Sequence, residues 1–315
     1  MRRVVALLAA VLALGLAACG DDGAEPGASQ EATLVLDFTP NAVHAGIYHA
    51  QATGEFAKRG VDLQIREPSA SSDAPKLLEA GRADFAVMDI QDLAIARERG
   101  LDVVAVTPIV NRPLAAVIAR EGIAEPSDLA GRTVGVTGLP SDDAVLATVL
   151  AAGGLKPDSV KRVTIGFQAV AALAAGRIDA ATAFRNAEGI ELRRQEIPVH
   201  IFPVERFGAP PFPELVLTTR RQTLDRDPGL VTAVVAAIHH GSTQARRDPG
   251  RALRDLIVAN PGLDRASQHA QLRAVVDSLG GSFDTEVLEQ WSRWTSDHGI
   301  VKSPPDIERA FALGG

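Results

Sequence analysis

A group of polar and aromatic side chains follows the first apolar run of the chain, in the stretch "LDFTPNAVHAGIYHA" (residues 36–50). Asp37 offers a carboxylate and Phe38 a flat ring face. Asn41 offers an amide that both donates and accepts, and His44 an imidazole. We expect them at the carboxyl end of a strand and the start of a helix, where open α/β sheets bind ligands. The alternative is structural: Asp37 or Asn41 caps the helix, Phe38 is core, and His44 is a hydrogen-bond partner.

The stretch "TGLPSDDAVL" (137–146) has the pattern of a strand end, a turn and a helix start. Backbone N–H groups at a helix start are ready donors for a ligand, which makes Pro140, Ser141 and Asp142 candidates. No Lys or Arg accompanies them and two aspartates do, so a phosphate is disfavoured. The alternative is that Ser141 or Asp142 only caps the helix.

Two more candidate positions lie directly after apolar runs. Asp89 follows the run that ends at Met88, and Asn186 and Glu188 follow a later one in "AFRNAEG". We expect these side chains to face each other across a cleft, because both follow strand ends. For Asn186 and Glu188 an ordinary surface position is the alternative.

The chemistry of these candidates is coherent. They include three carboxylates and two amides, namely Asp37, Asp89, Glu188, Asn41 and Asn186. Such acceptors suit a flat heterocycle with an exocyclic amine, and a nearby carboxylate would favour protonation of its ring nitrogen. An aromatic face adds about 0.5–1.5 kcal/mol beyond the buried area. A free amino acid would instead require an Arg for its carboxylate, and Arg112 and Arg185 lie outside the pattern.

The elements that must position these residues alternate along the chain. Eight apolar runs are predicted to be strands: 33–37, 61–66, 84–88, 103–107, 133–137, 162–165, 179–184 and 199–204. Helical patterns lie between them, at 74–80, 91–99, 142–152 and 169–175. After about residue 222 only helical patterns follow. The order predicts an α/β fold with mixed, mostly parallel sheets.

An internal repeat indicates two similar units. "LLEAGRADFAVMD" (77–89) and "ALAAGRIDAATAF" (172–184) share the pattern Leu-x-Ala-Gly-Arg-x-Asp-x-Ala. Each predicts a helix closed by a glycine, followed by a strand. Proline-bounded extended segments flank the second unit, so we expect two lobes joined by a two-strand hinge. The predicted boundaries are 32–112 plus 217–315 for lobe one and 113–216 for lobe two.

The N-terminus resembles a bacterial lipoprotein signal. Arg2 and Arg3 precede an apolar core that ends in Leu-Ala-Ala-Cys, and Cys19 is the only cysteine. This resemblance implies a signal peptide over 1–18, lipid on Cys19 and a flexible tether over 19–31. We therefore expect the protein at the outer face of the cytoplasmic membrane. The alternative is an ordinary secretory signal with an incidental cysteine.

The amino-acid composition argues against several classes of partner and site. The net charge of −7 and the absence of a basic stripe argue against nucleic acid. A single cysteine excludes an intramolecular disulfide and a cysteine-based metal site. We expect no metal, no cofactor and no catalysis, and a monomer.

The opening "LDFTPNAVHAGIYHAQATGEFAKRGVDLQI" resembles solute-binding proteins of ABC importers for pyrimidine precursors of thiamine. "RPLAAVIAR", "PSDLAGRTVGVTG" and the segment 184–219 continue the likeness, which covers about 32 to 220. It implies the type II periplasmic-binding-protein fold, a hydroxymethyl- or formylamino-pyrimidine ligand and an ABC permease partner. One departure is Phe38, where this family has tryptophan.

Three functions therefore stand at the sequence level. The first is a binding protein for an aminopyrimidine. The second keeps the binding role but changes the ligand to a riboflavin-like heterocycle or a sulfonate- or nitrate-like solute, as the change at Phe38 suggests. The third is an enzyme, since fungal thiamine-pyrimidine synthases share the fold, although they use iron and a cysteine-containing segment. We expect the first.

Overall fold

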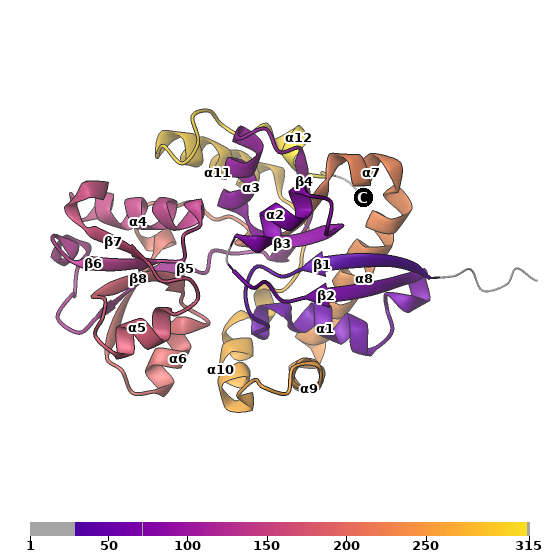
Figure 1. Ribbon diagram of the computed structural model, residues 1–315, viewed down its shortest axis with the longest axis horizontal. Helices are drawn as coiled ribbons and strands as arrows, with labels where there is room; N and C mark the ends of the chain where they lie inside the picture. The colour runs from indigo at the N-terminus through magenta and orange to yellow at the C-terminus, as the bar shows by residue number, and fades with distance from the viewer. Residues whose placement is uncertain (1–28, 71, 314–315) are drawn as a thin grey trace, which may run out of the picture.

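The protein consists of two α/β lobes that lie side by side (Figure 1). The computed structural model describes residues 29–70 and 72–313. The predicted signal peptide and lipidation site, 1–18 and Cys19, lie outside the described residues. Among the described residues, no helix is long and apolar enough to cross a membrane.

Lobe one is built on a five-stranded sheet with the order β2-β1-β3-β10-β4. Its strands are β1 (Gln30–Val35), β2 (Val61–Arg66), β3 (Phe85–Asp89), β4 (Val103–Val110) and β10 (Leu215–Arg220). β10 runs antiparallel to both of its neighbours, and the β1 pairings are parallel. The helices between the first four strands are η1 (Ala42–His44), α1 (Ala45–Ala52), η2 (Ala57–Arg59), α2 (Asp73–Glu79) and α3 (Ile90–Glu98).

Lobe two repeats this topology, with the order β7-β6-β8-β5-β9. Its strands are β5 (Ala115–Arg120), β6 (Thr133–Val136), β7 (Lys161–Thr164), β8 (Ala180–Phe184) and β9 (Val199–Pro203). Here β5 is the antiparallel strand. Its helices are η3 (Pro126–Leu129), α4 (Pro140–Ala152), η4 (Pro157–Ser159), α5 (Ala169–Ala174), α6 (Glu188–Arg194) and η5 (Val204–Arg206). The prediction of two α/β lobes with mixed sheets is confirmed.

The repeated sequence pattern performs the same task in both lobes. Gly81 and Gly176 end their helices with left-handed backbones, at φ 67° and 65°. The Asp84 carboxylate then accepts from the Thr33 N–H at 2.9 Å, and the Asp179 carboxylate from the Thr133 N–H at 2.8 Å. Each aspartate thus fixes the start of its strand against a parallel neighbour, β1 in lobe one and β6 in lobe two.

The chain crosses between the lobes twice, from β4 to β5 and from β9 to β10. The Glu214 carboxylate holds these crossings together, because it accepts from the backbone N–H groups of Leu114 and Ala115, the latter at 2.7 Å. Lobe one resumes with β10 at Leu215, so the boundary predicted at 216/217 falls inside this strand.

β1 begins earlier than the sequence suggests. It starts at Gln30, within the segment 19–31 predicted to be a tether. The Gln30 backbone N–H donates to the Gly60 carbonyl, and its side chain donates to the Asp227 carboxylate at 2.5 Å. These contacts fix residues whose composition alone resembles that of a linker, so the tether prediction is wrong at its last two positions.

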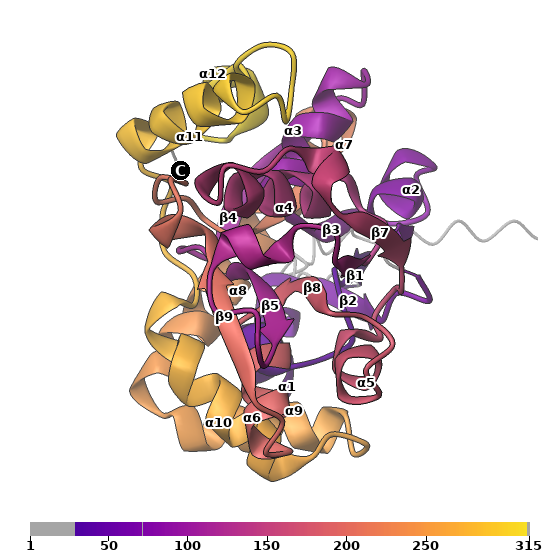
Figure 2. The same ribbon diagram turned by 90° about the vertical axis from the view of Figure 1, so that its left-hand side faces the viewer.

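The C-terminal third is helical and completes lobe one (Figures 1 and 2). It contains α7 (Arg221–Arg226), α8 (Pro228–Arg247), α9 (Pro249–Ala259), α10 (Arg265–Val275), η6 (Val276–Ser278), α11 (Thr285–Asp297) and α12 (Ile307–Ala310). α1 packs against α8 and α9, and α10 also reaches α6 of lobe two. In α11, Trp291 is fully buried against Phe311.

The long helix α8 continues past His239 and His240 to Arg247. Gly241 lies inside α8 and does not end it. A glycine at this position allows close packing, because a Cβ on it would lie 2.1 Å from the Gly46 carbonyl oxygen of α1. His239 bonds the Thr107 hydroxyl at 2.8 Å.

Candidate ligand-binding cleft

A cavity lies between the lobes and is lined by residues of both. Six of the ten predicted binding residues line it: Asp37, Phe38, Asp89, Ser141, Asp142 and Glu188. The other four, Asn41, His44, Pro140 and Asn186, are not among the lining residues. The strand ends of both sheets thus point to one space.

Asn41 and His44 support Asp37 from behind. The Asn41 backbone N–H donates to His44 Nδ1 at 3.2 Å, so the ring proton lies on Nε2, which donates to Asp37 Oδ1 at 2.9 Å. The Asn41 side chain caps η1 by accepting from the Val43 N–H at 3.0 Å. His44 is fully buried. These contacts fix the orientation of the Asp37 carboxylate.

Pro140 and Asn186 also have recognisable surroundings. Pro140 begins α4, where its fixed φ and missing N–H suit the first helical position. Asn186 is 3% exposed, and both its side-chain oxygen and nitrogen are buried with no hydrogen-bond partner among the described residues. It follows β8 and lies beside the cleft, two residues before Glu188.

Two aromatic rings meet across the cavity. Phe38 of lobe one and Phe167 of lobe two have centroids 4.4 Å apart at an interplanar angle of 68°. Both line the cavity and both are only partly buried. Ring faces that come from opposite lobes could hold a flat ligand when the lobes close on it.

The cavity carries an unusual amount of acid. Six carboxyl groups line it, with no Lys, Arg or His among its lining residues: Asp37, Asp89, Asp92, Asp142, Glu188 and Glu214. Burial raises the pKa of Glu188, Glu214 and Asp92 to about 7. Burial also raises the pKa of Asp142, and burial together with neighbouring carboxylates raises that of Asp89.

Some of these carboxylates already have partners within the protein. Asp142 accepts from the Thr137 hydroxyl at 2.6 Å and from the Thr182 hydroxyl at 2.5 Å, and it also accepts backbone N–H groups of the preceding turn. Glu214 holds the crossing strands as described above. Glu188 accepts one backbone N–H, from Phe184 at 3.1 Å. Asp37 and Glu188 therefore keep acceptor capacity for a ligand.

Direct contacts between the lobes close one side of the cavity. Ser141 of α4 reaches Asp89 and Asp92 of lobe one, with its hydroxyl 3.1 and 2.9 Å from their carboxylates. Below the cavity, the Ser267 hydroxyl of α10 donates to Glu191 of α6 at 2.6 Å. The structure is therefore a form in which the two lobes touch.

The lining residues that were not predicted from the sequence include Phe167, Asp92 and Glu214. Phe167 follows the predicted strand 162–165, so its position after a strand end was an available signal. Asp92 lies on the first turn of α3, three residues after Asp89, and thus on the same face. Glu214 follows a proline in an extended segment, a pattern that gave no sign of a binding role.

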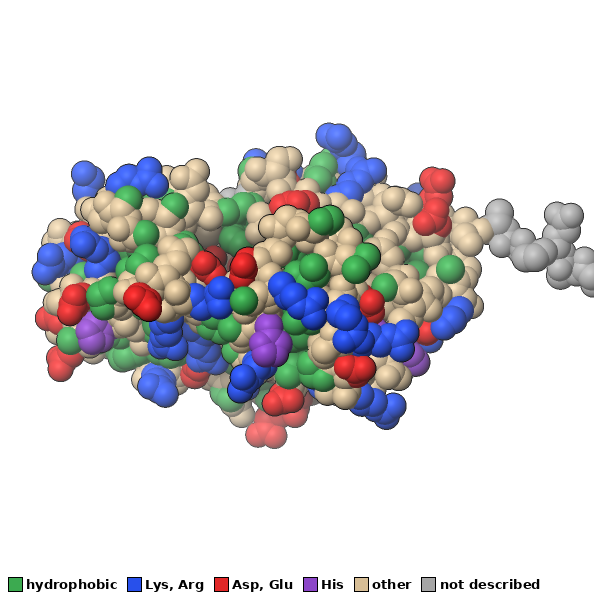
Figure 3. Space-filling model, turned by 90° about the horizontal axis from the view of Figure 1, so that it is seen from below, with side chains coloured by type: hydrophobic (Ala, Val, Ile, Leu, Met, Phe, Trp, Pro, Cys, Tyr) green, Lys and Arg blue, Asp and Glu red, His purple; other side chains and the backbone are tan. Residues whose placement is uncertain are grey.

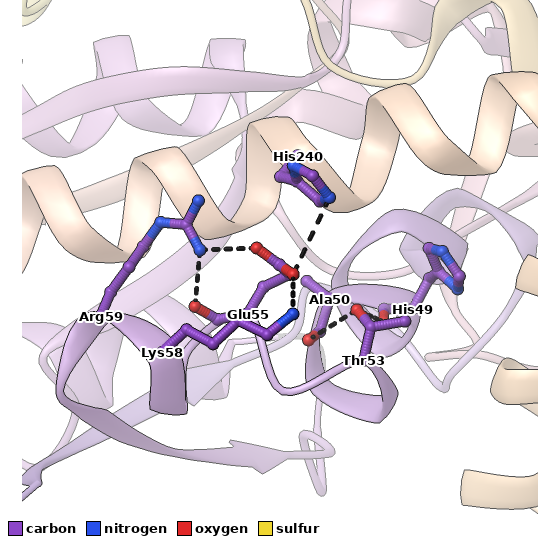
Figure 4. A network of polar contacts seen from close by, with 7 residues as sticks. All are labelled: His49, Ala50, Thr53, Glu55, Lys58, Arg59 and His240. Atoms are coloured by element: carbon purple, nitrogen blue, oxygen red, sulfur yellow. Dashed lines mark hydrogen bonds and ion pairs between the residues drawn. The ribbon is translucent and has the colours of Figure 1, made fainter.

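A second polar cluster lies outside the cleft, where the turn after α1 meets α8 (Figure 4). Glu55 pairs with Lys58 and Arg59 at 2.6 Å each, and His240 Nε2 lies 3.8 Å away. Hydrogen bonds from Lys58 and Arg59 lower the pKa of Glu55 to about 2. The cluster joins two elements of lobe one. In the described part of the chain, no three His, Cys, Asp or Glu side chains are grouped to hold a metal ion.

Comparison with known proteins identifies the family. The model of the family described as NMT1/THI5 like matches residues 41–252. The chain belongs to the NMT1/THI5-like family. A formylaminopyrimidine-binding protein of Halalkalibacterium halodurans is 29% identical over 98% of each chain. A 4-amino-5-hydroxymethyl-2-methylpyrimidine phosphate synthase of Saccharomyces cerevisiae is 23% identical, over 87% of this chain and 84% of the synthase. The predicted family resemblance is confirmed, and NMT1/THI5-like relatives include both binding proteins and synthases.

Solved structures share the fold. An alkanesulfonate-binding protein from Xanthomonas axonopodis, bound to MOPS, has a TM-score of 0.73 at 16% identity, over 90% of this chain and 98% of that one. A periplasmic nitrate-binding protein from Synechocystis PCC 6803 has a TM-score of 0.68 at 11% identity, over 89% and 84%. This NMT1/THI5-like chain therefore has the fold of periplasmic solute-binding proteins.

Proposed function

We propose that this protein is the extracytoplasmic solute-binding component of an ABC importer, and that it captures a thiamine pyrimidine precursor or a similar aminopyrimidine between its lobes. The observation that carries the proposal is the cavity itself: six carboxyl groups and two phenyl rings from opposite lobes, without a basic side chain among its lining residues. A flat, weakly basic ligand satisfies both features.

The acids favour a ligand that donates protons or carries positive charge. Asp37 Oδ1 is occupied by His44, so Oδ2 is the oxygen that would meet a ligand. Glu188, whose pKa is raised to about 7 by burial, can give up its proton to a ring nitrogen and then face the cation formed. An exocyclic amine would supply further N–H donors to the remaining carboxylates.

The same charges argue against the anionic alternatives. A sulfonate or nitrate ion in this cavity would face carboxylates at close range with no cation lining the site. The likeness to sulfonate- and nitrate-binding proteins is at 16% and 11% identity and concerns the fold. Riboflavin remains the second candidate, because two phenyl rings would also hold a larger flat ring system.

A binding role is also the better proposal than synthesis. The synthases that this chain resembles use a cysteine-containing segment, and the only cysteine of this sequence is Cys19. Mixing the protein with iron and pyridoxal phosphate should yield no pyrimidine product. Product formation would favour the enzyme.

Isothermal titration calorimetry with a panel of solutes tests the proposal. The panel is hydroxymethyl- and formylamino-pyrimidine, riboflavin, methanesulfonate and nitrate. We expect tight binding of an aminopyrimidine and no heat from the two anions. Tight binding of riboflavin alone, or of an anion, would replace the proposed ligand.

The proposed location has its own test. If Cys19 carries lipid, the protein expressed in a bacterium fed a labelled fatty acid should carry the label and sediment with membranes. The Cys19→Ser variant should lose both properties. Label that persists in Cys19→Ser would contradict the anchoring proposal.

A further inference from the structure

The contact between Ser141 and two aspartates joins the two lobes beside the cavity. Ser141 lies on the first turn of α4, and Asp89 and Asp92 lie at the end of β3 and on α3. Ser141 and Asp92 are 6% exposed each. The Ser141 N–H donates to Asp92 Oδ1 at 3.1 Å, and its Oγ lies 2.9 Å from Asp92 Oδ2 and 3.1 Å from Asp89 Oδ2.

The hydroxyl group has too few protons for these contacts if both carboxyls are ionised. A serine hydroxyl carries one proton, so it can donate to only one of the two oxygens. The other contact becomes a hydrogen bond only if that carboxyl is protonated and donates to the Ser141 oxygen. A continuous chain, from one carboxylic acid through Ser141 to the other carboxylate, therefore contains one extra proton.

The charges around Asp89 and Asp92 favour binding of that extra proton. The charged groups that face the two aspartates are three further carboxyls and one cation: Asp37, Glu214, Asp142 and Arg99. Burial raises the pKa of Asp92 to about 7, and burial together with the neighbouring carboxylates raises that of Asp89 well above its usual value. When the lobes separate, water reaches these groups and both pKa values should return toward the ordinary range.

We infer that Asp89, Ser141 and Asp92 form a proton-sharing latch that holds the two lobes together, so that closure of the ligand-free protein takes up a proton. The inference does not depend on which solute is bound. By linkage, the ratio of closed to open protein falls by up to about tenfold for each pH unit between the pKa of the open form and that of the closed latch, and it levels off above the latter.

Two substitutions separate the latch from an ordinary contact. Ser141→Ala removes the hydroxyl that joins the aspartates, so the closed-to-open ratio should fall about tenfold or more at low pH. Asp92→Asn replaces the protonated acid with a neutral amide of the same shape, whose NH₂ can donate permanently to the Ser141 oxygen. It should therefore stay closed at every pH tested.

Small-angle X-ray scattering of the ligand-free protein between about pH 5.5 and about pH 8.5 measures closure directly. Hydrogen exchange of the Ser141 amide gives a second measure, since this N–H donates across the lobes. Asp143→Asn is the matched control: Asp143 is exposed on the same turn of α4 and pairs with Arg162 at 2.6 Å. The control should open with pH as the wild type does.

The expected result is a wild-type radius of gyration that grows as the pH rises toward about 7 and then levels off, a Ser141→Ala variant that is expanded throughout, and an Asp92→Asn variant that is compact throughout. A wild-type envelope that does not change with pH overturns the inference. So does an Asp92→Asn variant that opens like Ser141→Ala. Neither result bears on solute binding, which the calorimetric panel tests separately.

Discussion

At the scale of single residues, Glu188 lowers the stability of the folded protein at high pH, and we propose that it also binds the ligand. Its folded pKa of about 7 lies above the ordinary value of 4.5. The stability it contributes is therefore complete below about pH 4.5 and is lost as pH rises through about 7. Such a cost is typical of groups retained for function.

Glu188→Gln should consequently have two opposite effects. Above about pH 8 the ligand-free variant should be more stable than the wild type, by up to about 3 kcal/mol, and near pH 4.5 the difference should vanish. Its affinity for an aminopyrimidine should fall about 10- to 100-fold, because the carboxylate that faces the ligand is gone. Chemical denaturation and calorimetry measure the two effects. Equal destabilisation at both pH values would contradict this view of Glu188.

The aromatic pair makes a second residue-scale prediction. Phe38→Leu and Phe167→Leu each keep an apolar side chain but lose a ring face, so each should weaken aminopyrimidine binding about 5- to 10-fold. Phe207→Leu is the matched control, since Phe207 pairs with Phe202 in lobe two and does not line the cavity. Calorimetry should show unchanged affinity for the control. Unchanged affinity in both cleft variants would exclude stacking between the lobes.

At the scale of elements, the sequence predicts the strands and the repeat well, because the local rules agree there. The runs 61–66 and 199–204 became β2 and β9 within one residue, and Gly81 and Gly176 end their helices as expected. Contacts between distant parts of the chain could not be predicted from the sequence. Gly241 has the local character of a helix end, and only the approach of α1 explains it.

The same limit applies to the site. The predicted residues after strand ends mostly line the cavity, because parallel strands deliver their ends to one edge. Asn41 and His44 lie one layer behind, since their bonds run along the backbone and to Asp37. Phe167 and Asp92 meet their partners only when the lobes come together, which no local pattern encodes.

The crossing of α1 and α8 gives the element-scale prediction. Alanine favours a helix over glycine by about 1 kcal/mol, so Gly241→Ala would stabilise an unpacked helix. Here the new Cβ would meet the Gly46 carbonyl, and we expect a loss of about 1–3 kcal/mol instead. Gly250→Ala, in α9 with no atom closer than 3.5 Å to its Cβ, should be neutral or stabilising. Urea denaturation of both variants decides the sign. Stabilisation by Gly241→Ala would mean that the two helices do not pack this closely.

At the scale of the whole molecule, the cleft collects acidic side chains, whereas one outer face of the protein carries both charges. On the face seen from below, acidic and basic side chains are interspersed (Figure 3). The cleft instead collects carboxyls from both lobes, and burial raises the pKa of three of them to about 7. Closing the two lobes thus brings carboxylates together in a buried space, and a positively charged ligand reduces the repulsion between them.

The thermal stability of the ligand-free protein should therefore fall as the pH rises toward about 7 and level off above it. The raised pKa values mean that the folded state binds these protons more tightly than the unfolded chain does. Stability is therefore lost as a rising pH removes the protons from the folded state. Aminopyrimidine should raise the melting temperature more at about pH 6 than at about pH 8, because at the higher pH neither the free ligand nor Glu188 holds the proton that the bound ligand carries. Differential scanning calorimetry at both pH values measures this. A ligand-free melting temperature that is constant or rises over this range would contradict the charge argument.

The most direct measurement is the ¹⁵N NMR chemical shift of the ring nitrogens of a labelled aminopyrimidine bound to the protein near neutral pH. A ring nitrogen that is unprotonated in free solution at that pH should show the upfield shift of a protonated nitrogen once bound. A ligand that binds with its ring nitrogens unprotonated, or that does not bind at all, would contradict the claim that this acid-lined cleft captures a weakly basic heterocycle.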